Sequence, residues 1–130
     1  MIVDSSALLA ILLQEPEARQ LAKTIALAER RQMSAANLLE IELVAAGRTG
    51  DIGSADIDRL VRNFQIQIVP FSINQASLAR TAVRSFGRGH HPARLNFGDC
   101  FAYALAKEQA EPLLFKGDDF SKTDIEVAVF

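Results

Sequence analysis

Residues 95–120 read LNFGDCFAYALAKEQAEPLLFKGDDF and carry the strongest evidence for the fold class. The first half, 97–108, has the apolar spacing of a helix that buries one side. Pro112 then introduces the apolar run 113–115, and Gly117 ends it, which is typical of a short buried strand. A helix followed directly by a wholly apolar strand indicates a parallel sheet that is covered on both faces.

The same alternation of helix and strand continues outward from this stretch. Strands are predicted at 2–3, 31–35, 66–69 and 113–115, with an edge strand at 125–130. Helices are predicted at 5–13, 16–29, 38–48, 56–64, 73–86 and 97–108. We expect Ser5 or Ser6 to cap the first helix, and Asn37 to cap the third with Glu40 as its capping-box partner. The pattern predicts one α/β domain over residues 1–130, with three layers (α/β/α) and a mostly parallel central sheet.

Composition excludes several classes of protein. The chain has 130 residues, 49% hydrophobic and 23% charged, which is typical of one globular domain. With 14 Lys and Arg against 16 Asp and Glu, the net charge of -2 argues against nucleic-acid binding by bulk positive charge alone. The single cysteine, Cys100, excludes a disulfide framework and a cysteine-rich zinc site. No signal peptide or membrane span is predicted, so we expect a cytoplasmic protein with no membrane partner.

Acidic residues follow the predicted strands. Asp4 lies directly after strand 2–3, and Asp118 and Asp119 lie just after strand 113–115. Glu40 and Asp99 fall in the first turns of their predicted helices. In a parallel sheet the strand ends and the starts of the following helices share one rim, so these carboxylates are expected to converge.

Converging carboxylates repel one another unless a cation lies between them. Hard oxygen ligands suit Mg²⁺ or Mn²⁺, and such an ion can activate water against a phosphodiester. A purely structural interpretation exists for each acid: Glu40 as a capping-box partner, Asp99 as an acid at a helix N-terminus, Asp118 and Asp119 as turn residues. Asp4 fits that interpretation least well, because a carboxylate beside a buried strand end needs a partner.

The chain resembles the PIN-domain ribonucleases, and among them the VapC toxins of bacterial type II toxin–antitoxin pairs. The resemblance rests on four segments in order: MIVDSSALLAILLQEPE, NLLEIELV, LNFGDCFAYALAKE and PLLFKGDDFSKTDI. It implies a Mg²⁺-dependent endoribonuclease, with Mn²⁺ as an alternative ion, acting on structured RNA of the translation machinery. It also implies a VapB-like antitoxin partner, a homodimer and a toxin–antitoxin hetero-oligomer.

Carried over by motif, the resemblance implies four catalytic acids, Asp4, Glu40, Asp99 and Asp119. Asp4 and Asp99 would bind the metal directly, and Glu40 would act through water. Asp119 is favoured over Asp118 because the family acid usually precedes the Phe, here Phe120. Ser6 matches a family hydroxyl near the metal.

A basic stretch leads into Asp99. We expect Arg84, Arg88 and Arg94 to bind RNA phosphates, supported by Arg80 and by spacing that places several of them on one helix face. The alternative is a solvated helix face and loop. His90 and His91 are adjacent, which disfavours a shared metal ion.

Two further features bear on partners and packing. Leu8, Leu9, Leu12 and Leu13 exceed what one buried stripe needs, so an exposed remainder would mark the groove for the antitoxin. The aromatic residues Phe97, Phe101 and Tyr103, like Cys100, are expected to be core residues.

Other functions compete with the nuclease. An aspartyl-phosphate phosphatase needs a second Asp where Ser6 stands, and a receiver domain needs an Asp after the strand that ends at Val69 and Pro70. No phosphate-binding glycine motif is present. The remaining alternative is a catalytically inactive PIN-like module that binds RNA or protein, although retention of all four acids argues against it.

Overall fold

A four-stranded parallel sheet forms the centre of the molecule, in a computed structural model that describes residues 1–48 and 50–130. The strand order is β3-β2-β1-β4, with every neighbouring pair parallel. The strands are β1 (Ile2–Val3), β2 (Gln32–Ser34), β3 (Gln67–Val69) and β4 (Leu113–Leu114). β1 lies between β2 and β4, because Ile2 pairs with Gln32 on one side and with Leu113 on the other.

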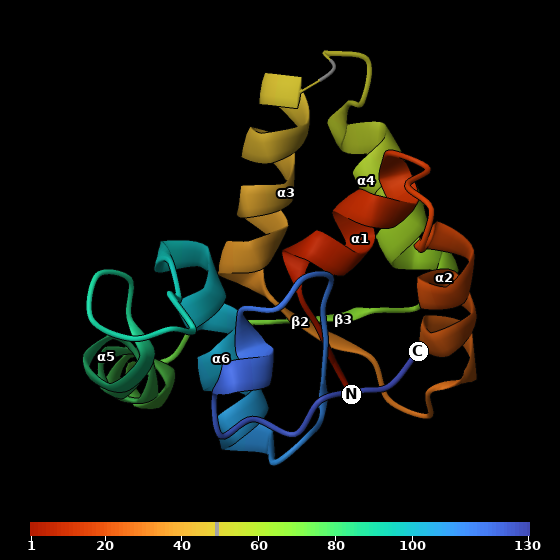
Figure 1. The fold of residues 1–130 in the computed structure, drawn as a ribbon. Coiled ribbons are helices and arrows are strands. Elements are labelled where there is room, and N and C mark those ends of the chain that lie inside the picture. The colour runs from red at the N-terminus through yellow and green to blue at the C-terminus, as the bar shows by residue number, and fades with distance from the viewer. Residues whose placement is uncertain (49) are drawn as a thin grey trace.

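Helices connect the strands, as Figure 1 shows. They are α1 (Ser5–Leu12), α2 (Ala18–Leu27), α3 (Ala35–Arg48), α4 (Ser54–Asn63), α5 (Ile73–Phe86) and α6 (Phe97–Gln109), with a short 3-10 helix η1 (Phe120–Lys122). Within residues 1–48 and 50–130, none of these helices combines the length and apolar character that a membrane crossing requires.

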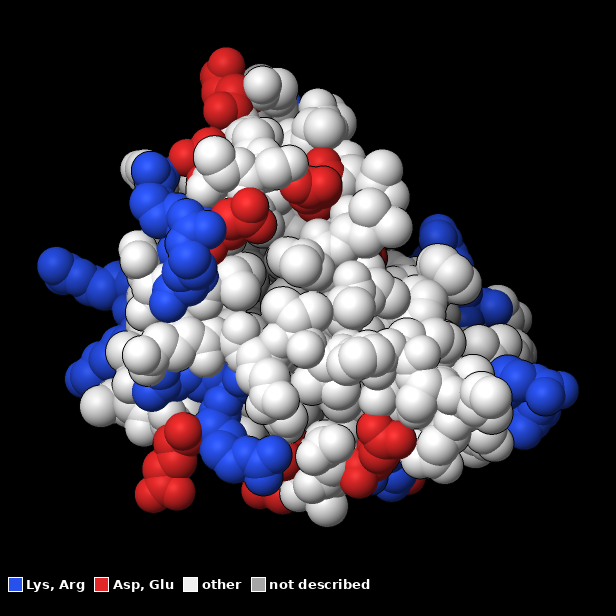
Figure 2. All heavy atoms as spheres, turned by 180° about the vertical axis from the view of Figure 1, so that it is seen from behind, with Lys and Arg blue, Asp and Glu red and all other residues white. Residues whose placement is uncertain are grey.

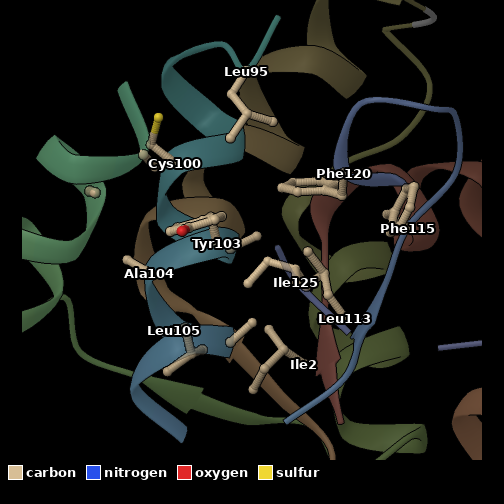
Figure 3. Close-up of a cluster of buried hydrophobic side chains, with 14 of the residues drawn as sticks. Ile2, Leu95, Cys100, Tyr103, Ala104, Leu105, Leu113, Phe115, Phe120 and Ile125 are labelled. Atoms are coloured by element: carbon tan, nitrogen blue, oxygen red, sulfur yellow. The ribbon is translucent and has the colours of Figure 1, made fainter. Parts of the chain in front are cut away.

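Two hydrophobic cores lie on opposite faces of the sheet. Ile2 and Leu113 face α5 and α6, while their chain neighbours Val3 and Leu114 face α1 to α4. Successive strand residues point to opposite faces, so each two-residue strand contributes to both cores. Figure 3 shows the first core, where Ile2, Ile125 and Leu113 lie together beside α6, which carries Tyr103 and Leu105. The predicted α/β class, parallel sheet and three layers are therefore confirmed.

The predicted edge strand at 125–130 is wrong. The tail meets the sheet at one isolated bridge, between Leu113 and Val127. Asp124, just before it, accepts hydrogen bonds from Tyr103 and Lys107 of α6, and Ile125 is buried in the core. These side-chain contacts hold the tail to α6, and β4 is too short to offer it a longer ladder.

Two predicted helix starts are also corrected. Asp4, rather than Ser5 or Ser6, caps α1, since its carboxylate accepts from the Ser6 backbone N–H. α3 begins at Ala35, so Asn37 is inside the helix and Glu40 lies beyond the first turn. The predicted capping box is therefore absent there, and both side chains are free for long-range contacts.

Candidate active site

Asp4 is fixed at the carboxyl end of β1. Its backbone N–H donates to the Leu114 carbonyl at 2.9 Å, which anchors it to β4. One carboxylate oxygen, Oδ2, accepts from the Ser6 backbone N–H at 3.0 Å and from Ser6 Oγ at 2.6 Å. The other, Oδ1, is buried with no hydrogen-bond partner among the described residues. A buried carboxylate oxygen without a donor is costly, which makes Asp4 Oδ1 a candidate ligand atom.

Ser6 links the Asp4 carboxylate to the segment that follows the neighbouring strand, β4. While its hydroxyl donates to Asp4, the same oxygen accepts from the Lys116 backbone N–H at 3.0 Å, just after β4. The hydroxyl thus holds the Asp4 side chain in one orientation. The resemblance implied a hydroxyl near the metal at this position, and that role of Ser6 stays a prediction.

Asp99 lies in the first turn of α6. Its Oδ2 accepts from the Asn96 backbone N–H at 2.8 Å, and Asn96 Oδ1 accepts from the Asp99 N–H at 2.9 Å. This capping box fixes the helix start, as the structural interpretation of Asp99 required. Asp99 is nevertheless only 9% exposed, a much deeper burial than a helix cap needs.

Glu40 reaches the same region from α3. Its Oε2 accepts from Ser5 Oγ at 2.6 Å and from Asn37 Nδ2 at 2.9 Å. Its Oε1 lies against α6, where a Cβ built on Gly98 would meet it at 1.9 Å. Glu40 is therefore held between α1, α3 and α6, and its contact with Asn37 is a side-chain bond inside the helix rather than a helix cap.

The pKa values show that these carboxylates share one electrostatic environment. Burial, opposed by the Ser6 hydrogen bonds and reinforced by the charge of Glu40, raises the pKa of Asp4 to about 6. Burial raises the pKa of Asp99 to about 7, reinforced by the charges of Asp4, Asp119 and Glu40. The convergence predicted from the strand ends is thus present for Asp4, Glu40 and Asp99.

The acids after β4 are the exposed members of the group. Gly117 has a φ of +109°, a left-handed turn that suits glycine, and Asp118 and Asp119 follow it on the surface. The charge of Asp119 contributes to the raised pKa of Asp99. This favours Asp119 over Asp118, and its assignment as the fourth acid stays a prediction.

The side-chain atoms at the site decide whether it suits a metal ion. All the candidate ligands are carboxylate oxygens, and Asp4 Oδ1 is buried and free to coordinate, which fits a hard divalent cation. Across residues 1–48 and 50–130, no three His, Cys, Asp or Glu side chains are arranged to hold an ion as they stand. The residues fit the chemistry of such an ion because every candidate donor is a hard carboxylate oxygen.

The raised pKa values predict that the metal-free protein becomes less stable as the pH rises from about 4.5 to about 7.5. Both acids bind protons more tightly when folded than when unfolded, so their contribution is largest near the unfolded pKa and is lost through about 6 for Asp4 and 7 for Asp99. Chemical denaturation in EDTA across this range measures it. A free energy of unfolding that is constant or increases toward pH 7.5 would contradict the expectation.

The basic stretch lies on α5 and the following loop. Arg84, Arg88 and Arg94 are exposed. The Arg88 N–H donates to the Leu95 carbonyl at 3.1 Å, so the loop closes immediately before Asn96 and the start of α6. In Figure 2, which shows the molecule from behind, Lys and Arg project at both sides, at the one where α5 lies and in larger number at the opposite one, and the middle of the face is mostly uncharged. The placement agrees with the predicted RNA contacts, which stay a prediction.

Other predicted roles have mixed outcomes. Tyr103 and Cys100 are buried as expected, but Phe97 is 83% exposed. Phe97 packs on one side only, against Phe101 at a ring distance of 4.8 Å. The prediction of Phe97 as a core residue is wrong, because it is the first residue of α6 and its ring contacts the partly buried Phe101 at the surface. His91 Nδ1 accepts a hydrogen bond from the Ala93 backbone N–H, so this side chain makes a contact within its own loop.

The sequence paired Asn37 with Glu40 only as a capping box, and Ser5 was not predicted as a partner of Glu40. Asn37 is three residues before Glu40, so the two share one helix face, and that spacing was the available signal. It was interpreted as a cap because the helix was expected to start at Leu38, three residues after its observed start at Ala35. The contact of Ser5 with Glu40 spans 35 positions and has no local signal.

The fold and the acidic site define a class: an α/β/α domain with buried carboxylates at the carboxyl ends of a parallel sheet. The sequence model of the PIN domain matches residues 1–126, and the chain belongs to the PIN-domain family.

Individual relatives agree with this membership. The chain is 43% identical over 125 residues to VapC ribonuclease Mb0640 of Mycobacterium bovis, covering 96% of this chain and 95% of that one. Among solved structures, VapC20 of Mycobacterium tuberculosis, a toxin that cleaves the sarcin–ricin loop, superposes with a TM-score of 0.75 at 13% identity, covering 98% and 97%. A toxin–antitoxin complex from Klebsiella pneumoniae gives 0.70 at 17%, covering 98% and 95%. At these identities the solved structures support the fold.

Proposed function

We propose that the chain is a metal-dependent endoribonuclease, the toxin of a type II toxin–antitoxin pair, which hydrolyses phosphodiester bonds in structured RNA of the translation machinery. The observation that carries the proposal is the buried, unpartnered Oδ1 of Asp4, within electrostatic range of Glu40. The identity to curated VapC ribonucleases over nearly the whole chain supports it.

Two of the acids would bind the metal ion, and the other two would orient the attacking water. Asp4 and Asp99 would hold the ion, each with one oxygen fixed by the protein through Ser6 or Asn96. Glu40 keeps Oε2 on Ser5 and Asn37, so Oε1 would orient a water and accept its proton. A bound divalent ion supplies a water of lowered pKa and offsets charge on the phosphoryl group. Asp119, exposed at the rim, would direct the same water.

The proposed ion is Mg²⁺, with Mn²⁺ as a substitute. The donors are oxygens, which favour hard cations. Burial and the neighbouring Asp99 raise the pKa of the Cys100 thiol to about 11, so it is not a thiolate ligand at neutral pH. The thiol instead donates to the Asn96 carbonyl.

RNA would be bound by Arg84, Arg88 and Arg94, close in the chain to Asp99. An acidic site repels phosphates, so affinity requires positive charge at its margin. The exposed side chains of α5 and its loop provide that charge. The cytoplasm, where translation RNAs occur, is the proposed place of action.

The proposed partners are a VapB-like antitoxin and a second copy of the chain. The expected apolar remainder on α1 is smaller than predicted, because Leu8 and Leu9 are buried and Leu12 and Leu13 are partly buried. Leu27 at the end of α2 is exposed instead. The similarity to a toxin–antitoxin complex supports the antitoxin, which would cover the metal site.

Removal of divalent ions is expected to abolish RNA cleavage. The purified chain should cut cellular RNA in Mg²⁺, lose that activity in EDTA and regain it with excess Mg²⁺ or Mn²⁺. Without RNA, Mn²⁺ should raise the melting temperature of the wild type but not of Asp4→Asn, because only the wild type gains binding energy. Sequencing of cleavage ends after brief induction in cells, with Asp99→Asn as control, would identify the RNA.

Two results would contradict the proposal. Cleavage that persists unchanged in EDTA would exclude a metal-dependent reaction. Binding of RNA without cleavage, together with no stabilisation by Mn²⁺, would favour the inactive binding module.

A further inference from the structure

Asn37 is a fully buried amide that bridges two helices near the acidic site. Its Nδ2 donates to Glu40 Oε2 at 2.9 Å and to the Gly98 carbonyl at 3.0 Å. An amide nitrogen carries two hydrogens, so these two bonds use both of them. The second bond joins residues 61 positions apart, and Figure 1 shows the start of α3 beside the start of α6.

The orientation of the amide follows from its neighbours. Both groups that it faces, a carboxylate and a carbonyl, are acceptors, so only the nitrogen can point at them. Asn37 Oδ1 then lies buried without a partner in the part of the chain that the structure describes. That unpaired acceptor carries an energetic cost, which packing alone does not explain.

Gly98 completes the contact from the side of α6. A Cβ at this position would lie 1.9 Å from Glu40 Oε1 and 2.5 Å from Glu40 Cδ, so the Glu40 carboxylate occupies the space that a side chain would take. Asp99 is the next residue in the chain. The position of Glu40 relative to Asp99 is therefore set where Asn37, Glu40 and Gly98 meet.

We propose that Asn37 is a positioning residue that fixes the distance between Glu40 and Asp99, and thereby the affinity of the site for a divalent cation. The inference rests on the proposed function and extends it to a residue that does not touch the ion. Glu40 is held by Ser5 on the same oxygen, so the loss of Asn37 would release the tie to α6 while α1 still contacts Glu40.

Asn37→Leu is the first test, because leucine has a similar shape and cannot donate a hydrogen bond. The affinity for Mn²⁺, measured without RNA from the electron paramagnetic resonance signal of the free ion, is expected to fall by about 10-fold or more. RNA cleavage at limiting Mn²⁺ should fall in parallel and recover at saturating Mn²⁺. Asn37→Ser, too short to make both bonds, should change the affinity in the same direction and serves if the leucine variant does not fold.

Gln75→Leu is the matched control. Gln75 is also a buried amide with an unpaired oxygen, and its Nε2 likewise donates to a carboxylate, Glu108 at 2.6 Å, and to a carbonyl, Pro70 at 3.3 Å. It lies between α5 and α6, outside the acidic site. The control should lose stability as Asn37→Leu does, but keep the wild-type affinity for Mn²⁺.

A double-mutant cycle with Glu40→Gln separates positioning from general damage. If Asn37 acts through Glu40, then Asn37→Leu should cause little further loss of Mn²⁺ affinity in the Glu40→Gln background. Equal losses in both backgrounds, or wild-type affinity in Asn37→Leu, would overturn this inference alone. A wild type that neither binds Mn²⁺ nor cuts RNA would overturn the proposed function, and this inference with it.

Discussion

Asp99→Asn is expected to lower RNA cleavage about a thousandfold and, at the same time, to stabilise the metal-free protein at pH 8. The activity falls because a charged oxygen ligand is replaced by a neutral amide. Stability increases because the buried charge that Asp4, Glu40 and Asp119 oppose is removed. The amide oxygen can still accept from the Asn96 N–H, so the start of α6 is kept.

The two effects need separate measurements. Single-turnover cleavage at saturating Mg²⁺ gives the rate, and denaturation in EDTA at pH 8 gives the free energy of unfolding. Because one pKa unit corresponds to about 1.4 kcal/mol, the gain in stability should be of at least that order. At pH 4.5 the gain should largely vanish, since the wild-type carboxyl is then protonated in the folded state.

Asp124→Asn provides the matched control for this variant. Asp124 also contacts α6, but it accepts from Tyr103 at 2.8 Å and from Lys107 at 2.9 Å, and the Lys107 and Tyr103 contacts lower its pKa. Neutralising it should leave cleavage unchanged and should not stabilise the fold. Wild-type cleavage by Asp99→Asn, or a loss of stability equal to that of the control, would contradict the assignment of Asp99.

Reversing the charge of Arg84 and Arg88 together is expected to weaken RNA binding by about 10- to 100-fold at low salt. Both side chains are exposed on the stretch that leads into α6, and neither is needed for the core. If each contacts one phosphate, the slope of log affinity against log salt should become shallower by about two. Binding is best measured in the Asp99→Asn background, where the RNA stays intact.

The control for charge reversal is Arg19→Glu with Lys23→Glu on α2. These residues are exposed, have the same i, i+4 spacing and give the same change in net charge. They lie on the other side of the sheet from α5. Equal loss of RNA affinity in both double variants would show that net charge alone matters and would exclude a local phosphate contact at Arg84 and Arg88.

Much of the fold was predictable because it depends on neighbours in the chain. The apolar runs at 2–3 and 113–115 alternate with helices, which is sufficient for a parallel sheet with two covered faces. Asp4 and Asp99 were placed at one rim by the same rule, since each follows or opens an element there. The capping box of Asn96 and Asp99 is a local motif that was not predicted, although Asp99 was expected in the first turn of this helix.

The errors occur where tertiary contacts override local signals. The tail at 125–130 has strand-like composition, yet Tyr103 and Lys107 hold Asp124 on α6 instead. Asn37 has the spacing of a cap, yet α3 starts earlier and the amide turns to Gly98. In both places the preferred local structure is worth little against burial or a hydrogen bond from a distant element.

From the sequence alone came the order of helices and strands, the rim on which the acids lie and the family resemblance, because periodicity and chain order are properties of residues close together in the chain. The folded structure determined which carboxylate oxygen is free, why the pKa values of Asp4 and Asp99 are raised, and that Asn37 joins Glu40 to α6. Those properties depend on burial and on contacts across many positions, and they exist only once the layers have packed.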